Sequence, residues 1–120
     1  MTASRDPANW LPMAPRDFWM LLVLAEGPAH GYAILKASRA SAELEPRLGP
    51  TTLYRTLTRM VESGLVEAVA APDPEADGRR QYYGLTPLGR SVVGAELARL
   101  ERMVRLGRSV VRGPQGEGGV

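Results

Sequence analysis

Apolar residues recur at helical spacing in four segments of this chain, and two strand-like segments precede the last of them. The first predicted helix, residues 15–26, starts at a proline and is apolar on nearly every side before a Gly-Pro pair ends it. Further helices are predicted over residues 31–41 and 51–63, the latter ending at Gly64. Because the first helix needs cover on more than one side, we expect a second subunit to supply part of it.

Two short strands follow the third helix. Residues 65–70 and 79–85 favour strands, and the loop between them contains two prolines and three acidic residues. The two-residue period predicts that Tyr83 and Leu85 point inward. A helix, a glycine stop and a hairpin in this order indicate a helix-turn-helix followed by a wing, so the predicted fold is mostly α with a small β-hairpin.

The fourth helix is expected over residues 87–109, with a threonine as N-cap and a proline at its first position. Its apolar residues are spaced 4, 3 and 4 apart, as along a coiled-coil seam, and predict a dimer interface. These residues are Val93, Leu97, Leu100 and Val104. We therefore expect a flexible arm (1–14), a winged helix-turn-helix domain (15–86), a dimerisation helix (87–109) and a disordered glycine-rich tail (110–120).

The third helix combines an apolar stripe with a face suited to the major groove. Hydroxyls, an aromatic ring and arginines lie near its N-terminal end, where they could reach base edges and phosphates. The stripe is predicted to contain Leu53, Leu57, Met60 and Val61, while Thr56 is placed on the exposed face. The predicted DNA-binding residues are Tyr32, Lys36, Thr51, Thr52, Tyr54, Arg55, Arg59, Arg79 and Arg80, the last two on the wing. An ordinary solvated surface would explain the second-helix residues equally well, but not the lack of acids on the third.

Composition narrows the function. The net charge is only +2, so the chain is not a uniformly basic coat, and any nucleic-acid contact must be local. With no cysteine and a single histidine, His30, for which we expect a capping or packing role, no catalytic constellation, metal site or cofactor site can be assembled. The longest apolar run, residues 18–25, is too short to span a bilayer, and no signal pattern precedes it. We expect a cytoplasmic protein that is not an enzyme.

Three segments of the chain resemble the PadR-type transcriptional regulators, which are bacterial winged-helix proteins. They are FWMLLVLAEGPAHGY (residues 18–32), TTLYRTLTRMVESGLV (residues 51–66) and GRRQYYGLTPLGR (residues 78–90), in the order and spacing of that family. The resemblance implies a homodimer joined by the C-terminal helix, a palindromic operator, and release of DNA by a small aromatic or hydrophobic effector. The short region after the fourth helix resembles the compact subtype, whose relatives suggest an effector pocket at Trp10, Phe18, Trp19 and Leu22.

Two other interpretations stay open. A winged-helix module that binds only protein would be expected to lose the cations that this chain has on the third helix and the wing. A monomeric DNA-binding protein is disfavoured by the apolar first helix. The sequence does not identify the operator, the regulated genes or the effector, and it favours repression over activation only because it has no evident polymerase-contacting segment.

Overall fold

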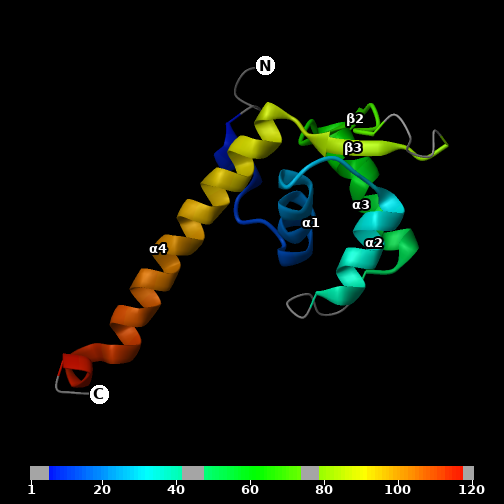
Figure 1. Ribbon diagram of the computed structural model, residues 1–120. Coiled ribbons are helices and arrows are strands. Elements are labelled where there is room, and N and C mark those ends of the chain that lie inside the picture. The colour runs from blue at the N-terminus through cyan, green and yellow to red at the C-terminus, as the bar shows by residue number, and fades with distance from the viewer. Residues whose placement is uncertain (1–5, 42–47, 74–78, 118–120) are drawn as a thin grey trace.

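The computed structural model describes residues 6–41, 48–73 and 79–117, with side chains as far as residue 113. It is mostly helical with a small antiparallel sheet (Figure 1). The elements follow in the order η2 (Pro7–Trp10), α1 (Pro15–Ala25), β1 (Ala29–His30), α2 (Gly31–Ala40), α3 (Pro50–Ser63), β2 (Val66–Val69), β3 (Tyr82–Leu85) and α4 (Pro87–Glu117).

The sheet has three strands in the order β1-β3-β2, whereas the sequence predicted only the β2–β3 hairpin. The additional strand, β1, lies just before α2, where Ala29 pairs with Tyr83 and His30 with Tyr82. A strand of two residues has no detectable periodicity, so it could not be predicted from the sequence. Strand β1 joins the start of α2 to β3, the middle strand of the sheet.

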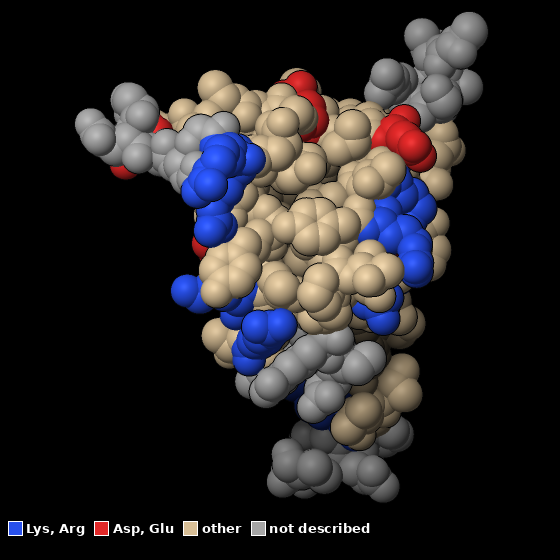
Figure 2. All heavy atoms as spheres, turned by 90° about the vertical axis from the view of Figure 1, so that its right-hand side faces the viewer, with Lys and Arg blue, Asp and Glu red and all other residues tan. Residues whose placement is uncertain are grey.

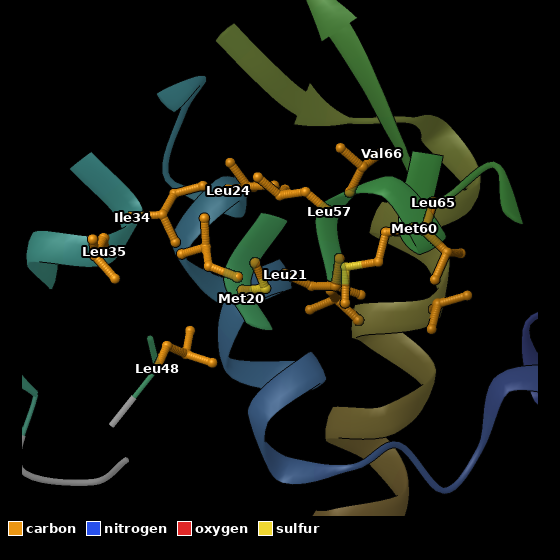
Figure 3. Packing of buried hydrophobic residues seen from close by; sticks show 13 residues of the cluster. Met20, Leu21, Leu24, Ile34, Leu35, Leu48, Leu57, Met60, Leu65 and Val66 are labelled. Carbon is orange, nitrogen blue, oxygen red and sulfur yellow. The ribbon is translucent and has the colours of Figure 1, made fainter. Parts of the chain in front are cut away.

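The core lies where α1, α2, α3 and the sheet meet, and apolar side chains from all of them point toward one another (Figure 3). Its fully buried members include Met20, Leu21 and Leu24 of α1. On α3 the buried stripe is rotated from the prediction, since Thr56 is buried and Val61 is 39% exposed. The prediction for Tyr83 and Leu85 is confirmed, because both pack against this core.

Helix α4 crosses the body beside α1 and then extends beyond it (Figure 1). The sequence predicted its end near Ser109, which was too early, because α4 reaches Glu117 and is interrupted only at Gly113, where φ is +54°. The part of the predicted disordered tail up to residue 117 is therefore helical apart from Gly113, and residues 118–120 lie outside the described residues. Val93, assigned to the dimer interface, is instead buried in the core of its own chain.

The N-terminal segment was predicted to be a flexible arm, but its described part, residues 6–14, packs on α4. Asp6 caps η2 by accepting a hydrogen bond from the amide of Ala8. The backbone amide of Met13 donates to the Glu96 carboxylate at 3.0 Å. The flexible arm was predicted because residues 1–14 contain two prolines and no helical period. The acceptor that fixes the segment lies more than eighty residues away, so local sequence could not reveal it.

Glu96 is the buried charge that joins this segment to α4. Only 1% of the residue is exposed, and its carboxylate accepts hydrogen bonds from Arg99 Nε at 2.6 Å and Nη2 at 2.9 Å. The Arg99 hydrogen bonds lower the pKa of Glu96, and the Met13 amide lowers it further, against the opposite effect of burial. The ionised form is thus favoured in the folded protein.

Glu96→Gln is expected to reduce the free energy of unfolding near neutral pH by about 1–3 kcal/mol, because it removes a charged acceptor. A lowered folded-state pKa contributes stability above the unfolded-state pKa, and this contribution is lost as the pH falls through the folded-state value. The difference in the free energy of unfolding between the wild-type protein and Glu96→Gln should therefore shrink as the pH falls into the acid range. Urea titrations at several pH values measure this, with Glu101→Gln on the exposed side of α4 as the control. Parallel pH profiles for wild type and Glu96→Gln would contradict it.

Candidate nucleic-acid interface

The face that carries α2, α3 and the wing has basic groups on both sides of a mainly uncharged centre (Figure 2). The acidic groups visible in this view lie toward its margin. Such a distribution suits a duplex, because phosphates flank each groove while base edges lie between them. The net charge of the chain conceals this local arrangement.

Tyr32 and Lys36 are exposed on α2, as predicted, and the structure brings them together with Arg80 of the wing. The Lys36 ammonium lies 5.6 Å from the centre of the Tyr32 ring, and the Arg80 guanidinium lies 5.2 Å from it. Two cations therefore share one aromatic ring at the surface, an attractive arrangement for both. It also concentrates positive charge at the point where α2 meets the wing.

Tyr54 of α3 lies with its ring against the start of α2. A methyl group added at Gly31 would fall 2.5–2.7 Å from the Tyr54 ring and hydroxyl atoms, so only glycine leaves room for the ring in this position. Tyr54 is nevertheless 48% exposed. A contact between the two helices of the helix-turn-helix thus holds this half-exposed aromatic ring in place.

The first turn of α3 presents its polar residues as predicted: Thr51, Tyr54 and Arg55 are exposed and Thr52 is partly exposed. Arg59 differs, because its guanidinium forms an ion pair with Asp17 of α1 at 3.2 Å. The ion pair is exposed and therefore weak, but it turns Arg59 toward α1. Among the DNA-binding residues predicted on α3, Arg59 is therefore the one whose side chain contacts another helix.

A hollow of about 380 Å³ separates the wing from the helix-turn-helix. The predicted residues Tyr32, Tyr54, Arg79 and Arg80 line it together. Residues that were not predicted also line it, namely His30, Gly31, Gln81 and Tyr83. The capping role predicted for His30 is confirmed, since Nδ1 accepts a hydrogen bond from the Ala33 amide at 3.0 Å.

Comparison with known proteins agrees with this geometry. Residues 20–95, which include all of the helix-turn-helix and the wing, match the family described as the transcriptional regulator PadR-like family. The chain belongs to this PadR-like family. An uncharacterized 37.1 kDa protein in transposon TN4556 of Streptomyces fradiae is 38% identical over 94 residues, which cover 76% of this chain and 25% of that protein. The chain thus spans about a quarter of the length of this relative.

Solved structures of PadR-like regulators share the fold. A PadR family transcription regulator from Clostridium difficile R20291 is 24% identical with a TM-score of 0.67, covering 79% of this chain and 96% of that one. A PadR-like transcription factor from Bacteroides fragilis is 24% identical with a TM-score of 0.65, covering 79% and 88%. A PadR-like regulator from Bacillus cereus is 16% identical with a TM-score of 0.65, covering 82% and 92%.

The family to which this PadR-like chain belongs is described as one of transcriptional regulators, in agreement with the sequence prediction. Within the described ranges, no helix is both long and apolar enough to cross a bilayer. No cluster of three or more histidine or acidic side chains suited to a metal ion occurs among the same residues.

A second hollow, of about 290 Å³, lies between α1, the N-terminal segment and α4 of this PadR-like chain. Three of the four residues predicted for an effector pocket, Phe18, Trp19 and Leu22, line it. The fourth, Trp10, packs against the hydrophobic core instead. The buried Glu96–Arg99 pair and Leu100 complete the lining. The predicted effector pocket and the predicted dimer seam thus meet at Leu100.

Proposed function

We propose that the chain is a homodimeric repressor that binds a two-fold operator and is released from it by a small molecule. The observation that supports this most directly is the convergence of α2, α3 and the wing on one basic face. Two such faces related by a two-fold axis would fit successive major grooves, about 34 Å apart along the duplex. Repression would follow because a dimer on its operator competes with other proteins for the same DNA.

In this proposal the contacts divide into two kinds. Thr52, Tyr54 and Arg55 at the start of α3 would contact base edges and the phosphates beside them. The phosphate contacts away from α3 would come from α2 and the wing, namely Tyr32, Lys36, Arg79 and Arg80. We assign Arg59 to the α1–α3 contact because of its ion pair with Asp17.

The free side of α4 supports the proposed dimer. Leu97 and Val104 are 42% and 51% exposed, and Val111, one heptad further, is 84% exposed. Heptad spacing places these three side chains along one line of the helix. A second α4 packed along this line would cover apolar surface that the single chain leaves in water.

The hollow beside Phe18, Trp19 and Leu22 supports the proposed effector site. Its lining combines aromatic and aliphatic side chains with one ion pair, which suits a small aromatic or hydrophobic ligand. Because α4 lies along both the hollow and the proposed seam, a ligand bound in the hollow could change the orientation of the two subunits relative to each other. It would release DNA only through different affinities for the DNA-bound and free arrangements.

Fluorescence anisotropy with labelled duplex from the protein's own promoter region, and random duplex as the comparison, tests the proposal. We expect tighter binding to the promoter, which weakens steeply as salt is raised. Equal, weak binding to both duplexes would favour a different operator location. The absence of binding to any duplex at low salt would instead favour the winged-helix module that binds protein.

Two variants should separate the two kinds of contact. Arg55→Ala is expected to weaken promoter binding by about tenfold, since one base contact is worth about 1–3 kcal/mol, with little effect on random duplex. The double variant Arg79→Ala and Arg80→Ala should weaken binding to both duplexes alike. The slope of log affinity against log salt concentration should fall by the amount expected for about two lost phosphate contacts. Unchanged affinity in both variants would overturn the assignment of contacts.

A further inference from the structure

We infer that His30 is a positioning residue that holds the wing arginine Arg80 in place for DNA, a role that rests on the proposed interface. His30 is the last residue of β1 and the N-cap of α2. It therefore stands where strand β1 of the wing sheet passes into α2, the first helix of the helix-turn-helix. Its side chain contacts both parts.

The contacts of the imidazole run in both directions. Toward α2, Nδ1 accepts the hydrogen bond from the Ala33 amide, which requires an unprotonated Nδ1. Toward the sheet, the ring meets that of Tyr82, its β3 partner, edge to face at 5.2 Å between ring centres. The ring orientation is thus fixed from two elements.

Arg80 lies against this fixed ring. Its Nη1 atom is 3.2 Å from Nδ1 and 3.4 Å from Nε2 of His30. The rings of His30 and Tyr32 are nearly parallel, with 8° between their planes and 6.4 Å between their centres, and the same guanidinium lies 5.2 Å from the Tyr32 centre. The arginine at the entry to β3 is therefore placed by α2 and not by the wing backbone alone.

Such placement matters because a free arginine side chain must lose rotamer freedom when it grips a phosphate. A guanidinium that is already confined has less to lose, so the same phosphate contact yields higher affinity. The effect of His30 on DNA binding should thus depend on the presence of Arg80. A residue that merely stabilised α2 would show no such dependence.

His30→Asn separates positioning from capping. Asparagine is a good N-cap and can still accept the Ala33 hydrogen bond, but it has no ring to place against Arg80 or Tyr82. We expect a thermal midpoint close to wild type and affinity for DNA about two- to tenfold weaker, which is the range set by confining one long side chain. The slope of log affinity against log salt concentration should be unchanged in His30→Asn, because the phosphate contact remains. In Arg80→Ala the slope should fall by the amount expected for about one lost phosphate contact.

The decisive measurement is a double-mutant cycle of His30→Asn with Arg80→Ala, read by anisotropy on promoter and random duplex. In the Arg80→Ala background, His30→Asn should change affinity by less than about 1.5-fold, since the two residues act through one contact. In the Arg55→Ala background its effect should be fully retained. Additive effects of His30 and Arg80 would overturn the positioning role alone. Wild-type affinity in Arg80→Ala would overturn the wing contact of the proposed interface as well.

Discussion

Replacing Leu97 and Val104 together by glutamate should convert the proposed dimer into a folded monomer and weaken promoter binding about 100-fold or more. Both side chains are exposed in the single chain, at 42% and 51%, and neither belongs to the hydrophobic core, so the substitution leaves the core packing intact. Glutamate is also a good helix former, so α4 itself should persist. Four carboxylates brought together across a two-fold seam would repel one another and lose their water. Without the partner, each recognition helix would bind its half-site alone, and linkage of two binding sites is worth about 10²–10⁴ in avidity.

The control is Leu106→Glu on the same helix. Leu106 is 66% exposed, more than either seam residue. It lies two residues beyond Val104, about 200° around the helix, and therefore on the opposite side. Its replacement should leave both the assembly and the DNA affinity as in wild type. This comparison separates loss of the seam from a general effect of negative charge on α4.

Light scattering after gel filtration gives the oligomeric state, and anisotropy on the same samples gives the affinity. A double variant that remains dimeric would place the subunit contact elsewhere on the chain. A monomeric variant that keeps full promoter affinity would show that one winged-helix domain suffices for binding, so the two-fold operator would have to be abandoned.

The helices could be predicted from the sequence because their signals are local. The stop of α3 at Gly64, where φ is +87°, and the capping of α4 by Thr86 both follow from residues within one turn of the feature. The exposure of Tyr32 and Lys36 on α2 was also predicted, since residues four apart share one face of a helix. These features depend on periodicity and caps, which a single sequence records directly.

What the sequence could not give depends on contacts between distant residues. Val93 fits the heptad seam as well as Leu97 does, but the two differ because Val93 is buried in the core of its own chain and Leu97 is 42% exposed. The same applies to Arg59, whose partner Asp17 lies on another helix. At the candidate interface, the polar residues predicted from the sequence lie at the surface, but the contacts of His30 with Arg80 and Tyr82 were not predicted, because strand β1 is only two residues long.

The largest effect on stability is expected from Gly89→Ala, at the junction between the wing and α4. The amide of Gly89 donates to Thr86 Oγ1 at 2.9 Å, and Thr86 Oγ1 donates in turn to the Gly64 carbonyl oxygen at 2.6 Å. The Thr86 amide also donates to the Leu65 carbonyl oxygen at 3.1 Å. These bonds draw the first turn of α4 onto the end of α3, where a Cβ at residue 89 would overlap the Leu65 carbonyl oxygen.

The obstacle at Gly89 is backbone, which cannot turn aside as the end of a side chain can. Overpacking of this kind costs about 3 kcal/mol at the upper end of its usual range, which corresponds to a fall of about 10 °C or more in Tm for a chain of this size.

Gly94→Ala provides the matched control on α4, because a Cβ there meets nothing within 4 Å. Alanine should stabilise that helical position by about 0.5–1 kcal/mol. The two Gly→Ala changes should therefore shift Tm in opposite directions in thermal unfolding followed by circular dichroism. A Gly89→Ala protein as stable as wild type would mean that α4 can move away from Leu65 at no cost, and the junction could then not fix the wing relative to the recognition helix.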